Sequence, residues 1–200
     1  MTVSRETLLP EYFSERGVEV TRYAEILATK GIEWGLIGPR EGDRIWERHI
    51  ANCVPITTLM KEGGKVLDVG SGAGLPGIVI ALARPDLKVT LLEPLARRVD
   101  FLNETIAELG LPITVVRSKA EAYKGSFDYV VARAVAPLPK LYGMVRHLIV
   151  PGGSLLAMKG ERALEELAEM GEVKGLKPTL HEVVVGELPP SRIVEITKAG

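Results

Sequence analysis

From Lys65 onward, the chain alternates short β-branched runs with longer amphipathic segments. This alternation is typical of buried parallel strands joined by crossover helices. It predicts five strands, at residues 65–69, 89–92, 113–116, 127–132 and 154–158. Helices are predicted between them at residues 77–83, 95–109 and 138–148, with Gly110 placed as a helix C-cap. The fold class predicted for the core is therefore a doubly wound α/β sheet.

Both ends of the chain differ from this core. Residues 1–60 show no strand alternation and space their apolar groups as a helix does, with a glycine-rich loop around Arg40, so we expect a helical N-terminal extension. It would belong to the same domain as a Rossmann-like core over residues 61–200. After a charged helix near residues 161–169, the runs 182–185 and 192–197 predict a hairpin, which gives the sheet an antiparallel edge.

Composition narrows the protein class. A chain of 200 residues with 46% hydrophobic content suits one globular domain. Its apolar stretches are too short to cross a bilayer and it begins without a secretory leader, so we expect a cytoplasmic protein with no membrane partner. The formal net charge of −1 argues against coating nucleic acid by bulk attraction, and any RNA contact would need a local patch.

Metal chemistry is not expected. Cys53 is the only cysteine, which excludes an intramolecular disulfide and a cysteine-rich zinc site, and we expect it to be a small buried hydrophobe. His49 has no second histidine or cysteine nearby in the sequence, and we interpret it as a packed structural residue.

The segment from residue 66 to residue 77 runs from a strand through a glycine-rich turn into a helix, where adenosine cofactors bind in this architecture. Glycines let the backbone approach a ligand, and the helix start offers unpaired N–H groups. Glu93, at the end of the next strand, is placed to accept hydrogen bonds from ribose hydroxyls. Asp68, inside the strand end, is placed to face the cofactor.

Two other readings of this turn stay open. It could be a plain tight connection, or the fingerprint of a dinucleotide-dependent oxidoreductase, because Gly72, Gly74 and Gly77 satisfy the G-x-G-x-x-G pattern. Against the second reading, Gly70 rather than Gly72 closes the strand, and Asp68 lies within it.

The run Leu67-Asp68-Val69-Gly70-Ser71-Gly72-Ala73-Gly74-Leu75-Pro76-Gly77 resembles motif I of the GidB/RsmG family, the 16S ribosomal RNA guanine-N7 methyltransferases of the decoding-site loop. The likeness continues over most of the chain, in Arg48-His49, Arg84-Pro85, Leu91-Leu92-Glu93, Arg98, Phe101-Leu102, Ala120-Glu121, Val131-Ala132-Arg133-Ala134 and Lys159-Gly160. The resemblance implies a class I methyltransferase fold, S-adenosylmethionine as cofactor, and 16S rRNA or the small ribosomal subunit as partner.

The resemblance also implies roles for individual residues. Catalytic roles fall to Arg133, which would close the pocket near the methyl-transfer centre, and to Lys159. The cofactor would be held by Gly70, Leu75 and also Arg133, with Ala120 and Glu121 bracketing the adenine, Glu93 on the ribose, and Asp68 and Gly72 nearby. RNA contacts would come from Arg48, Arg98, Lys119 and Arg192.

The chain departs from the family pattern at two places. Gly35-Leu36 stands where an Asn-Leu pair is usual, which puts a role for that asparagine in doubt. Lys119 stands where an arginine is common, which keeps the charge but loses planar bidentate geometry.

The absent motifs agree with attack by guanine N7, which carries a lone pair and no proton and so needs no general base. There is no Pro-Cys nucleophile for cytosine C5, and Ala132-Arg133-Ala134 stands where adenine-N6 enzymes carry an Asn/Asp-Pro-Pro-aromatic motif. The alternatives are a methyltransferase for a small molecule or protein, and a module that binds S-adenosylmethionine without catalysis.

Overall fold

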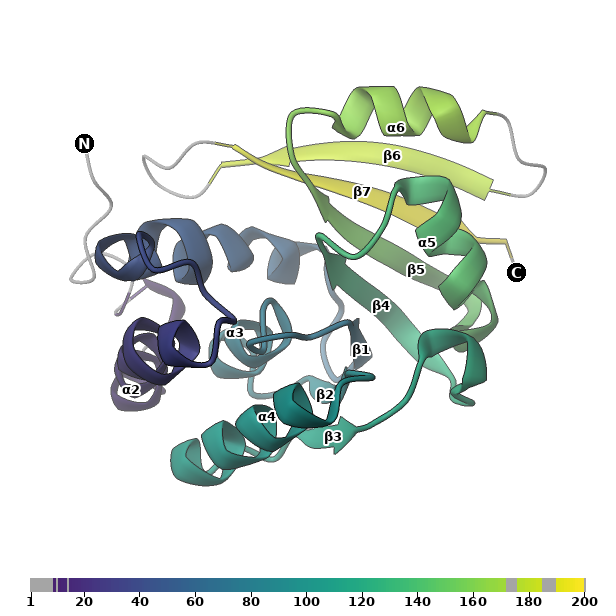
Figure 1. Ribbon diagram of the computed structural model, residues 1–200. Coiled ribbons are helices and arrows are strands. Elements are labelled where there is room, and N and C mark those ends of the chain that lie inside the picture. Colours follow the sequence, from purple (N-terminus) through teal and green to yellow (C-terminus); the bar gives the residue numbers. More distant parts are fainter. Residues whose placement is uncertain (1–8, 10, 14, 172–175, 185–189, 200) are drawn as a thin grey trace.

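The computed structural model describes residues 9, 11–13, 15–171, 176–184 and 190–199. These residues form a seven-stranded sheet in the order β3-β2-β1-β4-β5-β7-β6 (Figure 1). The strands are β1 (Lys65–Val69), β2 (Lys88–Leu92), β3 (Thr114–Val116), β4 (Phe127–Arg133), β5 (Ile149–Lys159), β6 (Leu176–Val183) and β7 (Ser191–Lys198). Strands β1 to β5 are parallel, whereas β7 is antiparallel to both β5 and β6. This is the fold of class I S-adenosylmethionine-dependent methyltransferases.

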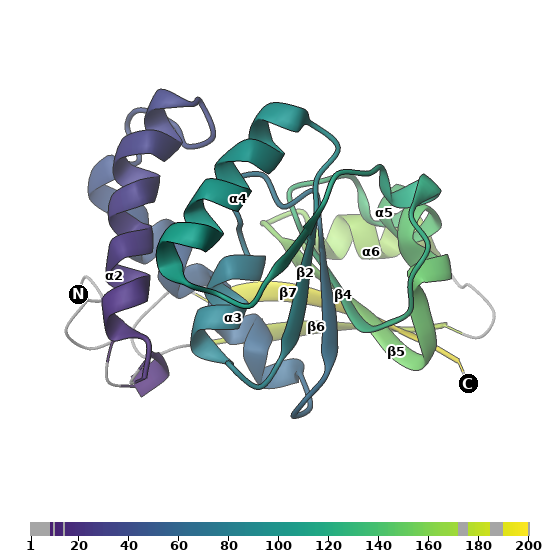
Figure 2. The same ribbon diagram turned by 90° about the horizontal axis from the view of Figure 1, so that it is seen from below.

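Helices cover both faces of the sheet (Figure 2). One face carries α2 (Gly17–Ile26), the π-helices η1 (Leu27–Gly31) and η3 (Ile45–Ala51), the 3₁₀-helices η2 (Gly42–Arg44) and η4 (Pro55–Leu59), α3 (Gly77–Ala83) and α4 (Ala96–Leu109). The other carries the 3₁₀-helices η5 (Ala120–Ala122) and η6 (Arg146–Leu148) with α5 (Leu138–Val145) and α6 (Ala163–Met170). Two apolar cores result, one on each side of the sheet.

The side-chain alternation of β1 shows why the sheet needs both layers. Val66 packs into the core on the α3 face, whereas Leu67 and Val69 pack into the core on the α5 face. All three are buried. They lie on opposite faces because successive side chains of a strand point to opposite sides of the sheet. A strand that is apolar on both sides is stable only where helices exclude water from both.

The N-terminal segment is mostly helical where it is described, with turns and a loop at residues 34–41, and it is part of the first core. Val20, Tyr23 and Ile50 are fully buried in the same cluster as Ile78 of α3. The Tyr23 hydroxyl donates a hydrogen bond to the Ala73 carbonyl at 2.8 Å, which joins α2 to the glycine-rich turn after β1. This contact ties the turn to a helix fifty residues away in the sequence.

The sequence pattern predicted the first four strands to within one residue at each end. The fifth prediction was too short, because β5 begins at Ile149 rather than residue 154. The Pro151-Gly152-Gly153 run has the composition of a turn, and Gly152 has φ +79°. The strand passes through it at an irregularity in the pairing of β4 with β5.

The predicted strand at residues 182–185 was misplaced, because β6 runs from Leu176 to Val183. The sequence analysis missed its start because Pro178 lies in the middle. An edge strand accepts proline, since one side of its backbone makes no ladder hydrogen bonds. Residues 185–189 of the predicted connection lie outside the described residues. The charged helix is also shifted, to Ala163–Met170.

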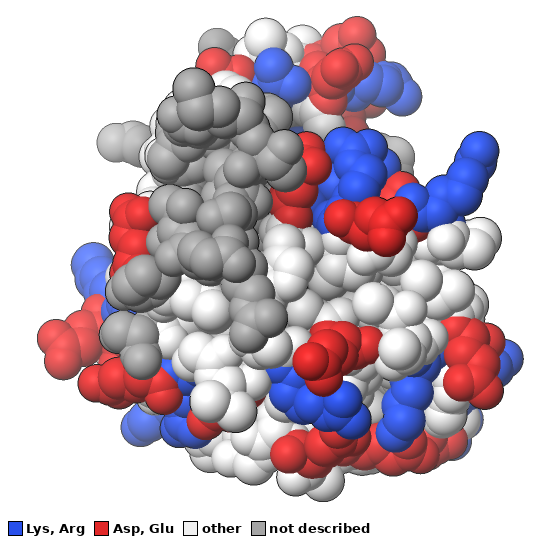
Figure 3. All heavy atoms as spheres, turned by 90° about the vertical axis from the view of Figure 1, so that its left-hand side faces the viewer, with Lys and Arg blue, Asp and Glu red and all other residues white. Residues whose placement is uncertain are grey.

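Within the described ranges, no helix is long and apolar enough to cross a membrane. On the face nearest α2, acidic and basic side chains are intermingled around a band of uncharged residues (Figure 3). Such a surface produces no strong single-sign field on this side.

We expect Tyr23→Phe to lower the free energy of unfolding by about 1 kcal/mol, because the buried Ala73 carbonyl loses its donor. Urea denaturation measures this loss. Tyr142→Phe, in α5 on the opposite face, is the matched control and should leave the unfolding free energy nearly unchanged. Equal effects of the two substitutions would show that the hydroxyl contact contributes nothing.

Candidate active site

The turn between β1 and α3 depends on glycines whose backbone lies in the left-handed region. Gly70, Gly72 and Gly74 have φ of +69°, +57° and +96°. The turn is closed by hydrogen bonds from the Gly74 and Leu75 N–H groups to the Ser71 carbonyl, at 2.7 and 3.1 Å. Side chains at these positions would strain the backbone, so the motif leaves bare peptide groups facing the space above the sheet.

Glu93 is buried at the end of β2 and fixes the turn to the next connection. Its Oε2 accepts a hydrogen bond from the Gly72 N–H at 3.0 Å, and its Oε1 accepts one from the Leu95 N–H at 3.1 Å. Its side chain is 1% exposed. Each carboxylate oxygen has two lone pairs, so both oxygens can still accept a bond from a ligand hydroxyl.

Asp68 is fully buried, and its Oδ2 accepts a hydrogen bond from the Gly77 N–H at 3.0 Å. Its Oδ1 has no hydrogen-bond partner. Burial raises the pKa of this carboxyl to about 7. Asp68 thus holds the start of α3 against β1, and it is not among the residues that line the adjacent pocket.

A pocket of about 560 Å³ lies over the carboxyl ends of β1, β2 and β4. Its lining includes Gly70, Gly72 and Leu75 from the turn, with Glu93 and Arg133 beyond. The sequence analysis expected all five at the cofactor site, and the fold brings them together. The geometry suits an adenosine cofactor, since glycine peptide groups and a buried carboxylate with spare lone pairs line the same pocket. We call it the cofactor pocket.

Other expected cofactor residues do not line this pocket. Ala120 is buried in the second core beside Leu67 and Leu92, while Glu121 and Lys119 are exposed next to it. Their roles at the adenine and at RNA stay predictions.

A second pocket, of about 470 Å³, adjoins the first and is lined by residues from β4, β5 and the start of β7. We call it the base pocket. An outer groove of about 350 Å³ opens beside it, lined by Arg44, Arg48 and Arg192 among others. Arg133 lines the cofactor pocket, the base pocket and the outer groove. It therefore stands where the three spaces meet.

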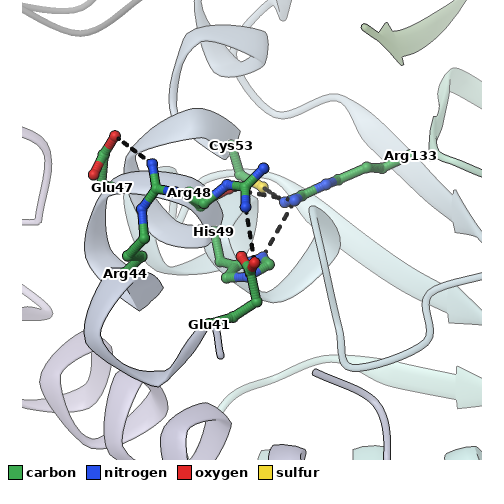
Figure 4. A network of polar contacts seen from close by, with 7 residues as sticks. All are labelled: Glu41, Arg44, Glu47, Arg48, His49, Cys53 and Arg133. Carbon is green, nitrogen blue, oxygen red and sulfur yellow. Dashed lines mark hydrogen bonds and ion pairs between the residues drawn. The ribbon is translucent and has the colours of Figure 1, made fainter. Parts of the chain in front are cut away.

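The N-terminal segment holds the Arg133 guanidinium in place (Figure 4). Nη2 donates to His49 Nδ1 at 3.2 Å and to the Arg48 carbonyl at 3.3 Å, and Nη1 donates to Cys53 Sγ at 3.4 Å. Cys53 is fully buried, as predicted, and burial raises the pKa of its thiol. The side chain from the end of β4 is thus attached to η3 and the residues that follow it.

Lys159 is engaged in a nearly buried clamp. Its ammonium donates to the Ala136 carbonyl at 2.7 Å and pairs with Glu166 Oε2 at 2.8 Å, and the lysine side chain is only 8% exposed. Glu166 Oε2 also accepts a hydrogen bond from the Leu138 N–H at 2.7 Å. Burial alone would raise the pKa of Glu166. The hydrogen bonds from Lys159 and the Leu138 N–H outweigh this effect, and the pKa is lowered. The clamp fixes the loop from residue 134 to residue 138, which lines the base pocket.

Most cations at the mouth of the site are already paired with carboxylates. Arg48 bonds Glu41 at 2.8 Å, Arg192 bonds Glu182 at 2.9 Å, and Arg98 lies 3.8 Å from Glu93. Arg48 and Arg192 line the outer groove, and Arg98 lines the cofactor pocket. Lys119 lies apart from this group.

The backbone conformation explains how glycine is accommodated at position 35, where the family usually has asparagine. Gly35 has φ +70°, a region open to glycine and, among other residues, best tolerated by asparagine. Glycine therefore keeps the backbone course that an asparagine would allow, without its amide. The neighbouring Leu36 and Ile37 line the cofactor pocket.

The sequence analysis did not assign three residues that the fold brings to the site. His49 contacts Arg133 and lines the cofactor pocket, and Asn52 and Glu166 line the base pocket. Only His49 gave a signal, since it lies in the Arg48-His49 pair. Asn52 Oδ1 accepts a hydrogen bond from the Ser191 hydroxyl at 2.7 Å, which only the folded chain shows.

Comparison with known proteins decides the family. The model of the GidB family, described as rRNA small subunit methyltransferase G, matches residues 18–187. The chain belongs to this family.

Relatives within the GidB family share about half of their residues with this chain. The ribosomal RNA small subunit methyltransferase G of Acidothermus cellulolyticus is 50% identical over 192 residues, which cover 92% of this chain and 86% of that protein. The protein of the same name from Mycolicibacterium gilvum is 58% identical over 153 residues, covering 74% and 67% of the two chains.

Solved structures agree on the fold of this GidB member. A methyltransferase from Pyrococcus furiosus superposes with a TM-score of 0.62 at 19% identity, over 94% of this chain and 100% of that one. A ribosomal protein L11 methylase from Lactobacillus delbrueckii gives 0.56 at 18% identity, over 74% and 77%. At this identity the likeness concerns the fold alone.

The raised pKa of Asp68 predicts that the free energy of unfolding depends on pH. Its folded pKa of about 7 exceeds the ordinary 3.8, so its contribution to stability is complete below pH 4 and is lost as pH rises through 7. Asparagine at this position does not titrate. We therefore expect the unfolding free energy of Asp68→Asn to rise by about 4 kcal/mol relative to that of the parent chain when the pH is raised from 4 to 8. Urea denaturation of the cofactor-free protein across this range is the measurement. Parallel pH curves for the two proteins would contradict the assignment.

The clamp on the 134–138 loop predicts a double-mutant result. Glu166→Gln leaves the nearly buried Lys159 ammonium without its carboxylate and should lower the unfolding free energy by about 2 kcal/mol. Lys159→Met added to it should recover part of that loss. Glu165→Gln, which breaks an exposed pair with Arg162 in the same helix, is the matched control with a much smaller effect. Additive effects of the two clamp substitutions would show that they do not act as a pair.

Proposed function

We propose that this GidB member transfers a methyl group from S-adenosylmethionine to N7 of a guanine in the decoding-site loop of 16S rRNA, either free or within the small ribosomal subunit. The observation that carries the proposal is the place of Arg133, at the junction of the cofactor pocket, the base pocket and the outer groove. Methyl transfer needs donor and acceptor in adjoining spaces, so that the nucleophile reaches the methyl carbon in line.

The cofactor pocket has groups suited to S-adenosylmethionine. Glu93 presents a buried carboxylate that can accept bonds from ribose hydroxyls, and Gly70 and Gly72 line the pocket without side chains. When bound there, the cofactor would supply a sulfonium methyl group that the guanine N7 lone pair can accept, with a thioether as leaving group and a positive charge left on the base.

The residues that line the base pocket favour a nucleophilic atom that has no proton to lose. Its lysine and its glutamate, Lys159 and Glu166, are bound to each other rather than free to take a proton. Guanine N7 needs no base, unlike an exocyclic amine. A target base in folded RNA would have to be unstacked to enter, at a cost of roughly a few kcal/mol.

Arg133 has donors to spare for the base. Its guanidinium carries five N–H groups, and three are used by the contacts with the N-terminal segment. The remaining donors are available to guanine O6. N7 itself must stay free to attack, so bidentate recognition of O6 and N7 is incompatible with reaction.

The outer groove offers the phosphate contacts. Arg48 and Arg192 lie on it with partly exposed side chains, and Arg98 lies at the cofactor pocket. Each must exchange a carboxylate partner for a phosphate, so RNA affinity should fall steeply with salt.

The direct test incubates the protein with radiolabelled S-adenosylmethionine and small-subunit RNA, or subunits, from a strain lacking the modification. The label is mapped by strand cleavage specific for N7-methylguanine. We expect one labelled guanine in the decoding-site loop. Cofactor binding without transfer to either form of the RNA would refute the substrate assignment and turn the search to small molecules and proteins.

We expect Arg133→Ala to lower the transfer rate at least about tenfold, because the base loses a charged donor, while affinity for S-adenosylmethionine changes little. Single-turnover kinetics gives the rate and calorimetry the affinity. Arg146→Ala, on an exposed residue at the far end of α5, is the control for loss of an arginine. Loss of cofactor binding together with activity would place Arg133 in the cofactor site rather than at the reacting base.

A further inference from the structure

His49 belongs to η3 of the N-terminal segment and lies beside Arg133, with its side chain 12% exposed (Figure 4). Nδ1 faces Arg133 Nη2 at 3.2 Å, and Nε2 faces Glu41 Oε2 at 3.3 Å without forming a hydrogen bond. Since a guanidinium has only donors, Nδ1 must be the unprotonated nitrogen, and the ring proton lies on Nε2 toward the carboxylate.

His49 Nδ1 is the nearest of the three acceptors of the Arg133 guanidinium, at 3.2 Å, and the only nitrogen among them. The other two acceptors are a carbonyl at 3.3 Å, near the limit for a hydrogen bond, and a thiol sulfur, which is a weak acceptor. Removing the imidazole lone pair would leave the guanidinium with these two marginal contacts.

Charges from three elements face the imidazole. Arg133 comes from β4, Glu41 precedes η2, and Arg48 lies on the same helix as His49. Burial, helped by the Arg133 and Arg48 charges and opposed by Glu41, lowers the pKa of His49 below its usual 6.5. A second proton, on Nδ1, would make the imidazole a third cation beside the single carboxylate of Glu41. It would also direct an N–H group at the Arg133 guanidinium.

We propose that His49 is a positioning residue for Arg133, accepting its hydrogen bond while neutral and releasing it when protonated, so that methyl transfer stops at acid pH. The activity part of this inference rests on the proposed function. The structural part, a neutral ring with its proton on Nε2, stands independently of any substrate.

Nitrogen-15 NMR of the histidine side chains tests the structural part on the substrate-free protein. We expect His49 to be neutral at pH 7 with its proton on Nε2, and to take up a second proton only below pH 6.5. His49→Asn identifies its signals. A proton on Nδ1, or a charged ring at pH 7, would overturn the proposal whatever the enzyme methylates.

Rates of methyl transfer between pH 5 and 9, at saturating cofactor and RNA, test the functional part. Asparagine places an acceptor oxygen where Nδ1 lies and does not titrate, so His49→Asn should keep most of the activity at pH 8 and lose the acid limb that His49 causes. His49→Leu should lower kcat about tenfold at pH 8, where the ring of the parent protein is neutral, with cofactor affinity unchanged. Glu41→Gln should move the acid limb to lower pH, because the carboxylate that favours the charged ring is gone.

His147→Asn is the control for removal of a histidine, since His147 lies in η6 and contacts the Tyr123 carbonyl. It should match the parent in rate and pH profile. A His49→Leu enzyme with the parent's kcat, or a His49→Asn enzyme with the parent's acid limb, would refute the positioning role. If the parent protein itself transfers no methyl group to rRNA, the proposed function fails, and the NMR result alone decides the state of His49.

Discussion

The site depends on one constraint of the sheet: the carboxyl ends of its parallel strands meet at a single edge. Strand β1 lies between β2 and β4, and the chain leaving β1 goes to one face of the sheet while the chain leaving β4 goes to the other. A crevice opens where these two connections part. Gly70, which directly follows β1, and Arg133, the last residue of β4, both line the pocket at this point.

The N-terminal segment makes contacts to the site that the sheet itself does not make. Arg133 belongs to a strand, yet the hydrogen bonds of its side chain in the described structure are made with residues 48–53, more than eighty positions earlier for His49 and Arg48. Tyr23 likewise reaches the turn after β1. The loop beyond Arg133 is fixed from the other side by Lys159 and Glu166. Two halves of the chain therefore hold the same short stretch from opposite directions.

The sequence predicted those features that follow from local pattern. The first four strands, the glycine turn and the position of Glu93 each depend on residues close together in the chain, and each was found. The start of β6 was missed because a proline is tolerated only where a strand lies at an edge, which is a property of the whole sheet. The contacts of Glu166 with Lys159 and of His49 with Arg133 were missed for a related reason: each partner lies in a different element, and no spacing rule connects them.

The paired cations at the mouth of the site have a consequence for selectivity among polyanions. Arg44, Arg48 and Arg192 each already have a carboxylate partner, at 3.2, 2.8 and 2.9 Å. A stray phosphate that reaches one arginine must displace that carboxylate and gains little. A ligand whose phosphates match several arginines at once displaces the carboxylates together, and the freed acids then repel any misaligned backbone. If the outer groove takes RNA phosphates as proposed, it would therefore discriminate by the spacing of negative charge rather than by its amount.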